Sequence, residues 1–490
     1  MTLPSWYLAL PVALPLLAGV AAAMLPLGQG KSGRGLFLLT LAAELALLAP
    51  ILAAKETSCQ LMTLSDCLPI LLRADLTGKF FAAVMAAVWA AAGLYAVEYM
   101  AHEDGSRRFF VFYLMTLGAL MGLCFAATMV TLYMFYEAMT LLTFPLVLHS
   151  GRKEAVAAGV KYLIYSVVGA SMALMGLLLL TPYAESLTFT HGGALAAQRL
   201  AGHEGLAQTA VFVMLLGFGA KAGMFPLHGW LPTAHPQAPS PASAVLSGVI
   251  TKAGVLGVFR LIYGLVGPDF LRGTWVQTAF MGLALFTVLM GSLLAYRERM
   301  LKKRLAYSTV SQVSYILFGL STLHPAGVAG ALLHVVCHAL VKNSLFMAAG
   351  AVILKTGKRR ADELAGVGRT MPVTMDAMLL ASLGLIGIPP CLGFISKWEL
   401  AQGGLSMIGV PSWLTFAGPA VLLLSALLTA GYLLPIGIDA FLRRGDETAR
   451  CEAGWKMLAP LLTLTALSVL LGMFPGWLTT LCSALTDTLM

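Results

Sequence analysis

The sequence predicts an all-α integral membrane protein of about fourteen transmembrane helices, and three observations support this fold class. The chain of 490 residues is 59% hydrophobic and only 11% charged, whereas about a quarter of the residues in soluble domains are charged. Its mean hydropathy is +0.85. Apolar stretches of about 20 residues, the length needed to cross a bilayer, recur along the whole chain. We therefore expect lipid to be its solvent.

Taken in chain order, the apolar stretches predict fourteen spans. They cover residues 5–26, 35–54, 78–100, 109–127, 129–149, 157–181, 207–226, 241–266, 275–295, 305–323, 325–354, 372–397, 412–440 and 457–483. The first stretch is long and lacks a basic leader, so we interpret it as a span and not as a cleavable signal. The loops between the spans are short, and no soluble domain is expected.

The charges of the loops support this count. With the N-terminus outside, the odd-numbered loops face the cytoplasm and hold twenty Lys and Arg residues. The opposite loops hold five, namely Lys55, Arg73, Lys79, Arg199 and Arg272. Lys and Arg accumulate in cytoplasmic loops, and a missed helix would scramble the alternation. We therefore expect a multi-pass protein of the cell inner (plasma) membrane with both termini outside. The same bias explains the net charge of +9 without nucleic-acid binding.

The sequence predicts no metal site and no cofactor in this chain. The seven cysteines are scattered and contain no C-x-x-C pair, which argues against an iron–sulfur or zinc site: Cys59, Cys67, Cys124, Cys337, Cys391, Cys451 and Cys482. No glycine-rich phosphate-binding loop is present either. We expect no redox chemistry in the chain itself.

Several ionisable residues remain inside the predicted spans. The most deeply placed acid is Glu137, Glu44 lies in the second span, and six cations remain: Lys161, Lys221, Lys252, Arg260, Lys342 and Lys397. A charge at the bilayer centre costs roughly 2.5–3.5 kcal/mol on insertion scales. These groups must therefore face the bundle interior, pair with one another or line water, and an ion or proton path is the default interpretation.

Each of these residues also has a structural interpretation. A static buried salt bridge would account for Glu137, but one acid cannot neutralise the three lysines Lys221, Lys252 and Lys397. Lys161 could anchor the cytoplasmic end of its helix, and Arg260 could extend its guanidinium to the membrane surface. Glu44 could pair with a neighbouring subunit or be a lone structural acid.

The predominance of lysine favours proton transfer. Burial disfavours the charged form of a lysine and a nearby carboxylate favours it. A lysine subject to both effects can load and release a proton near neutral pH, whereas arginine stays charged. The deep cations are mostly lysines.

His334, His338 and Lys342 are spaced i, i+4 and i+8, which places them along one stripe of a helix. Successive groups are then about 6 Å apart along the axis, a gap that one or two waters can bridge. Histidine is a natural proton relay. The rival interpretation of the H-x-x-x-H pair is a zinc site, but no Glu follows the first His and no third ligand is apparent.

Prolines interrupt the seventh and twelfth spans. Pro226 and Pro232 follow Lys221, and Pro389 and Pro390 precede Lys397. Proline breaks a helix, and freed backbone at membrane depth is tolerated where it lines a cavity. Broken helices at corresponding positions are typical of inverted repeats.

The spacing of the two breaks, five spans apart, predicts two inverted five-helix repeats. Helices 4–8 would form the first half-channel at residues 105–268, and helices 9–13 the second at 269–441. A three-helix segment at 1–104 would precede them, and helix 14 at 442–490 would follow.

The stretch from Lys221 to Arg260, KAGMFPLHGWLPTAHPQAPSPASAVLSGVITKAGVLGVFR, resembles the signature of the antiporter-like proton-translocating membrane subunits. This family occurs in respiratory complex I, in Mrp-type sodium/proton antiporters, and in energy-converting hydrogenases including formate hydrogenlyase. Further matches are KKRLAYSTVSQVSYILFG, HVVCHALVKNSLFMAAG and GIPPCLGFISKW, and FYEAMTL fits the family's fifth helix. The resemblance covers essentially the whole chain.

The resemblance implies a role for each buried group. Glu137 and Lys221 would be the charged pair of the first half-channel, and Lys252 the central relay. The other implied members of the proton path are the onward relay, the second-half lysine and the sixth-helix lysine: His334, His338, Lys342, Lys397 and Lys161.

The resemblance also implies partners. These are other membrane subunits of a multisubunit complex, including further antiporter-like subunits and a soluble redox arm that would carry any electron transfer. The leading hypothesis is a proton-translocating subunit of a redox-driven pump, most similar to hydrogenase-type subunits. The alternative is a subunit of an Mrp-type sodium/proton antiporter without redox partners. A scaffold that has lost transport and a stand-alone solute carrier are weaker alternatives.

Overall fold

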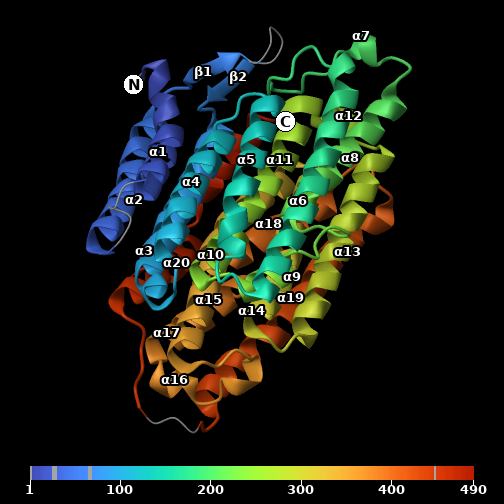
Figure 1. Cartoon of the computed structure of the whole chain (residues 1–490). Helices are drawn as coiled ribbons and strands as arrows, with labels where there is room; N and C mark the ends of the chain where they lie inside the picture. The colour runs from blue at the N-terminus through green and yellow to red at the C-terminus, as the bar shows by residue number, and fades with distance from the viewer. Residues whose placement is uncertain (1–2, 25–29, 64–68, 446–448) are drawn as a thin grey trace.

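The computed structural model describes residues 3–24, 30–63, 69–445 and 449–490. These residues form a bundle of long helices standing side by side, with a small hairpin at one end (Figure 1). Within them, twelve helices are long and apolar enough to cross a membrane. The predicted all-α membrane fold is confirmed. The end of the first predicted span, at residues 25 and 26, and Cys67 lie outside the described residues.

The N-terminal segment wraps one side of the bundle. Its helices are η1 (Ser5–Ala9), α1 (Leu10–Met24), α2 (Gly30–Ala53), α3 (Leu76–Tyr99) and η3 (Met100–His102). Strands β1 (Ser58–Thr63) and β2 (Pro69–Arg73) pair antiparallel between α2 and α3. The sequence predicts only a loop there, because these strands are short and lie between two apolar spans. Asp75 begins α3 by accepting a hydrogen bond from the Gly78 N–H at 2.8 Å.

The next part of the chain contains the fourth to eighth predicted spans, of which the seventh is the first broken one. Its elements are α4 (Ser106–Cys124), α5 (Met129–Val147), α6 (Lys153–Leu180), η4 (Thr181–Tyr183), α7 (Ala197–Leu200), α8 (Glu204–Ala222) and α9 (Leu231–Gln237). The eighth span then runs as one rod through α10 (Ser240–Val245), η5 (Leu246–Ile250), α11 (Thr251–Arg260) and η6 (Leu261–Val266), followed by α12 (Pro268–Leu271). The segments η5 and η6 are π-helical, a feature that often marks functional sites.

The remaining elements are α13 (Trp275–Arg297), α14 (Leu301–Ser321), α15 (Pro325–Thr356), η7 (Ala361–Glu363), α16 (Val367–Thr370), α17 (Pro372–Ile386), α18 (Leu392–Ser406), α19 (Ser412–Leu442), α20 (Trp455–Met473) and α21 (Gly476–Asp487). The sequence predicts one helix over 457–483 for the final span. This is wrong, because α20 ends at Met473 and α21 begins at Gly476, after Pro475. The count of fourteen spans and their division into inverted repeats stay predictions.

Both broken helices are confirmed. Helix α8 ends before Gly223, whose φ is +85°, and α17 ends before Gly387, whose φ is +94°. Such left-handed backbone is accessible mainly to glycine. Each break lies beside a lysine, Lys221 at the end of α8 and Lys397 within α18.

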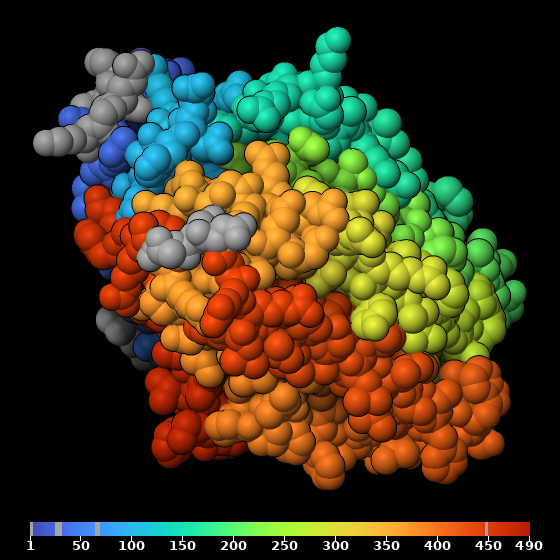
Figure 2. Space-filling view, turned by 90° about the horizontal axis from the view of Figure 1, so that it is seen from below, coloured from blue at the N-terminus to red at the C-terminus, as the bar shows by residue number. Residues whose placement is uncertain are grey.

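Burial identifies the centre of the bundle. The most apolar stretch of the eighth span is fully buried and that of α15 is 94% buried, whereas only 33% is buried in α1, α2 and α20. Seen from the end opposite to the chain termini, the N-terminal half lies along one side and the C-terminal half along the other (Figure 2). The eighth span and α15 therefore form the protein-enclosed core, and the outer helices face the surroundings.

Candidate proton path

The eighth span and α15 bring together the centre of the predicted path. The Nζ atom of Lys252 makes a close contact with Nδ1 of His338 and donates a hydrogen bond to the Ser247 carbonyl at 3.0 Å. The rings of His338 and His334 have centroids 6.3 Å apart. All of these side chains are buried. Lys252, His338 and His334 therefore lie in one buried row, with the two histidine rings as neighbours along α15.

From His334 the row reaches the second break. Nδ1 of His334 lies 2.9 Å from the Ser396 hydroxyl on α18, and the His334 ring stacks on Tyr315 with centroids 5.5 Å apart. One residue further, Lys397 donates hydrogen bonds to the carbonyls of Leu385 and Ile386 at 2.7 and 2.9 Å. These carbonyls are free because α17 ends there, so the break supplies acceptors for the ammonium group.

Lys221 occupies a separate polar pocket in the first half. Its Nζ donates hydrogen bonds to the hydroxyls of Thr140, Tyr162 and Ser166 at 2.8, 3.0 and 3.0 Å. Glu137 forms no ion pair with it in the described part of the chain, and Oε1 of Glu137 is buried without a hydrogen-bond partner there. The implied charged pair is therefore open, with the lysine bound by neutral oxygens instead.

Two further members of the predicted path point away from the row. Lys342 is fully buried and donates a hydrogen bond to the Leu305 carbonyl on α14 at 3.0 Å. Lys161 donates to the Thr233 hydroxyl on α9 at 3.1 Å. The structure thus joins Lys252, His338, His334 and Lys397 but leaves these two lysines as branches.

Sequence reasoning missed two buried polar residues near the row. His235 on α9 is fully buried, and neither of its ring nitrogens has a hydrogen-bond partner among the described residues. The same is true of both side-chain polar atoms of Gln312 on α14. His235 lies in the stretch TAHPQ between two prolines, and Gln312 lies in the hydroxyl-rich run YSTVSQVSY. That run of small polar residues inside a span was the signal that could have found Gln312.

The structure places Arg260 and Glu44 outside the row. The guanidinium of Arg260 binds the Asp75 carboxylate through two hydrogen bonds of 2.6 and 2.7 Å. Burial raises the pKa of Asp75, but the charge and hydrogen bonds of Arg260 outweigh it and hold that pKa below its ordinary value. Glu44 is 1% exposed, and neither carboxyl oxygen has a partner among the described residues. Within this chain Glu44 is therefore a buried acid without a partner among the described residues, and a pairing with a neighbouring subunit stays a prediction.

The matched region of a known family contains this whole row. A family model described as NADH:quinone oxidoreductase/Mrp antiporter, transmembrane, matches residues 126–418, which is more than half of the chain. The chain belongs to this family. The matched residues run from the start of α5 to within α19 and so contain every member of the predicted proton path.

Relatives from this family include three kinds of subunit. NADH-quinone oxidoreductase subunit N of Desulforudis audaxviator is 35% identical over 78% of this chain and 77% of its own length. Hydrogenase-4 component B of Escherichia coli is 32% identical over 83% of this chain and 63% of its length. The D subunit of the Na(+)/H(+) antiporter of Bacillus subtilis is 28% identical over 84% of this chain and 82% of its length.

Solved structures of the antiporter-like family share the fold. A chain of the Mrp complex from Dietzia sp. DQ12-45-1b superposes with a TM-score of 0.87 at 23% identity, covering 100% of this chain and 98% of that one. A chain of respiratory complex I from Thermus thermophilus with bound NADH gives a TM-score of 0.82 at 23% identity, covering 99% and 100%. The relatives and these structures belong to multisubunit complexes.

Proposed function

We propose that this chain moves protons across the membrane along Lys252, His338, His334 and Lys397, as one subunit of a multisubunit redox-driven ion pump. The observation that carries the proposal is a row of buried titratable groups at the centre of the bundle. Lys252 touches His338, the rings of His338 and His334 lie 6.3 Å apart, and His334 reaches Ser396 beside Lys397. Ionisable groups held at membrane depth are costly and are retained where they relay ions.

The open pair in the first half supplies the input for this row. Lys221 rests on three neutral hydroxyls while Glu137 lies free of an ion pair with it. A lysine that alternates between hydroxyls and a carboxylate alternates between environments that favour its neutral and charged forms. We infer that closure of this pair loads a proton onto Lys221 and that opening of the pair releases this proton toward Lys252.

Changing either member of this pair tests the proposal. Lys221→Ala or Glu137→Ala in the native complex should abolish proton pumping in proteoliposomes while the complex still assembles, because each removes half of the switch. The exposed cation Arg369 on α16 provides the control, since Arg369→Ala should pump at the normal rate. Unchanged pumping in both switch variants would refute the assigned roles.

The redox-driven complex is favoured over the Mrp-type antiporter by the relatives. The quinone-oxidoreductase and hydrogenase-4 relatives are 35% and 32% identical, against 28% and 31% for antiporter relatives. The alternative, a subunit of an Mrp-type sodium/proton antiporter, is supported by the antiporter relatives, which match 84% and 78% of this chain. Purification of the native complex decides between them. We expect hydrogenase- or quinone-reductase-type subunits to co-purify, and small membrane subunits alone would favour the antiporter.

We further propose that the protein lies in the cell inner membrane with both termini outside. The bias of Lys and Arg toward one set of loops supports this orientation. The described chain begins and ends at the same end of the bundle, beside the β1–β2 hairpin (Figure 1). The opposite end, which carries α16, would then face the cytoplasm.

A further inference from the structure

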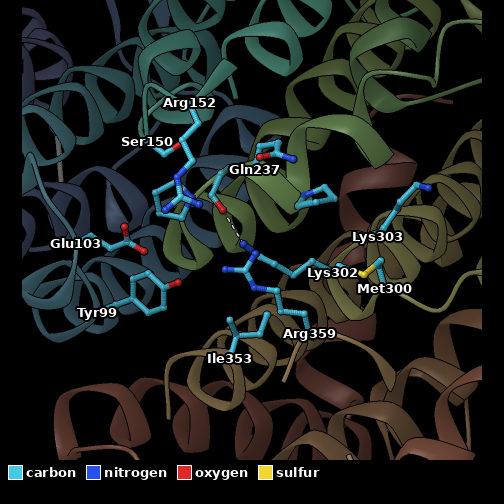
Figure 3. Close-up of a pocket in the computed structure, with 13 residues that line it drawn as sticks. Tyr99, Glu103, Ser150, Arg152, Gln237, Met300, Lys302, Lys303, Ile353 and Arg359 are labelled. Carbon is cyan, nitrogen blue, oxygen red and sulfur yellow. Dashed lines mark hydrogen bonds between the residues drawn. The ribbon is translucent and has the colours of Figure 1, made fainter. Parts of the chain in front are cut away.

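A cavity of about 210 Å³ opens at the end of the bundle opposite to the chain termini. It is enclosed by the end of α3, the loop after α5, the end of α9, the start of α14 and the end of α15. In Figure 3, Arg152 and Arg359 reach into the same space from opposite sides, with Lys302 beside them. The space can hold several water molecules.

The wall of this cavity is strongly basic. Arg152 and Arg359 form no ion pair through their guanidinium groups among the described residues, and Lys302 forms none either. Lys303 also lines the cavity, but its charge is neutralised by an ion pair with Glu298 at 2.8 Å. One acid, Glu103, also lines the cavity. Arg152, Arg359 and Glu103 are exposed, so these charges stand at the water-filled mouth of the cavity, and positively charged side chains that line a passage are a barrier to cations.

The floor of the cavity is titratable. Lys302 is 9% exposed, and its Nζ donates a hydrogen bond to the Ala238 carbonyl at 2.6 Å. Three residues before that carbonyl on the chain lies His235, whose imidazole has no hydrogen-bond partner among the described residues. The His235 ring stacks on Phe346 at 4.6 Å between centroids, one helical turn from Lys342. Titratable groups therefore lead from the cavity to the branch of the row on α15.

We propose that this cavity is a selective entrance, which loads protons onto Lys342 through Lys302 and His235 and keeps sodium out. The inference rests on the proposed function and specifies its substrate: the ion taken up from this end of the bundle is the proton and not sodium. Each proton that Lys342 gains leaves His235, which regains one from Lys302, and Lys302 regains its proton from cavity water. Sodium has no such hand-over and would have to pass the guanidinium groups as an intact cation.

Thiol labelling tests whether the electrostatic potential inside the cavity is positive, and it needs no transport measurement. Gln237 lines the cavity, so Gln237→Cys in the assembled complex is treated with anionic and cationic methanethiosulfonate reagents, with the unchanged chain as blank. We expect the anionic reagent to react at least tenfold faster. This preference should fall in the Arg152→Gln/Arg359→Gln background to that of Ser32→Cys, an exposed site on α2.

Three results of the labelling overturn the inference. These are a preference for the cationic reagent, a preference that survives loss of both arginines, and no reaction with either reagent. The last result counts because a cavity closed to water-soluble reagents cannot load protons from water.

Transport by the native complex in proteoliposomes tests the route. Lys302→Gln should slow proton uptake from this end at least tenfold, and Lys302→Arg should do the same, because arginine keeps the charge but does not release its proton. In Arg152→Gln/Arg359→Gln, sodium on this side should inhibit proton uptake, whereas the wild-type complex and Arg369→Gln should be insensitive to sodium. Normal rates of proton uptake in both Lys302 variants would overturn the proposed entrance. Inhibition of proton uptake by sodium in the wild-type complex would do the same.

Lys221→Ala in the same assay separates the two proposals. If it abolishes transport while both Lys302 variants pump normally, the row works and the entrance lies elsewhere. If Lys221→Ala pumps normally, the proposed function itself falls.

Discussion

At the scale of single residues, Lys221 illustrates how a buried charge is tolerated without a counter-ion. Three hydroxyls accept hydrogen bonds from its ammonium group, and hydrogen bonds to charged groups are each worth about 1.5–3 kcal/mol. They offset much of the loss of water. Because no carboxylate is bound, the lysine can still form a pair with Glu137 when that acid moves.

The ion pair between Arg260 and Asp75 should stabilise the fold in a pH-dependent way. The pKa of Asp75 is held below its ordinary value in the folded chain, so its contribution is present above about pH 4 and is lost as pH falls through the folded-state value. Asp75→Asn should lower the free energy of unfolding at pH 7 by about 3 kcal/mol, and the unfolding midpoint should fall with it. The difference from the wild type should shrink in acid.

Thermal unfolding of the purified protein in detergent over a pH series measures this effect. Asp269→Asn is the control, because Asp269 and Arg272 form a pair at the same end of the bundle in which the acid is 86% exposed. It should change little at any pH. An Asp75→Asn defect that persists undiminished at low pH would contradict the role assigned to the carboxylate.

Sequence reasoning predicted which residues are buried ionisable groups but not their partners. The depth of Lys252 and His338 follows from their place in apolar runs, and the family resemblance implies that both belong to the relay, but their direct contact required the structure. The Arg260–Asp75 pair joins residues 185 positions apart, and no local pattern encodes such a pairing. The hydroxyls around Lys221 escaped notice because Thr, Tyr and Ser carry no charge to mark them.

At the scale of elements, the break between α17 and α18 combines two requirements at Gly387. Its φ is +94°, and a Cβ there would lie 3.0 Å from Cδ of Lys397. Left-handed backbone costs a non-glycine residue roughly 1–2 kcal/mol. Gly387→Ala should therefore lose about that much stability and also pump more slowly, because Lys397 is displaced from the carbonyls that it caps.

A matched glycine separates these two effects. Gly357, at the end of α15, has φ +72° and open space where a Cβ would stand. Gly357→Ala should lose similar stability yet pump at the normal rate, as measured by unfolding midpoints and proteoliposome assays. Equal pumping by the two variants would show that the Lys397 contact is unimportant.

The elements themselves were predicted unevenly from the sequence. Hydropathy located the long spans, and the prolines located both breaks, because each signal has a direct steric or solvation cause. The β1–β2 hairpin was missed, since Ser58–Thr63 and Pro69–Arg73 are too short for a clear alternation. The π-helical segments η5 and η6 were also missed, because their extra residue per turn depends on packing around the eighth span and not on composition.

At the scale of the whole molecule, burial and charge describe a polar core inside an apolar shell. The eighth span and α15 are almost entirely enclosed, while α1, α2 and α20 are largely exposed. A membrane places lipid or partner subunits against those outer helices, so the core residues meet neither. This arrangement follows from hydropathy for the shell, but the order of helices around the core required the tertiary structure.

The proposed orientation predicts protease accessibility in intact cells. Tags at the N-terminus and at the C-terminus should both be removed by protease added outside, because both chain ends lie at one end of the bundle. A tag inserted at Gly357, which is exposed at the other end, should be protected until the membrane is opened. The reverse pattern would invert the orientation and place the basic cavity outside.

The seating of Lys397 on the end of α17 has a mechanical consequence. While the amine is charged, its hydrogen bonds to Leu385 and Ile386 tie α18 to the tip of α17 across the gap in the span. Once the amine gives up its proton, this tie weakens and the two half-helices can change their angle. We therefore expect the charge state of this one side chain to set the angle between the two half-helices.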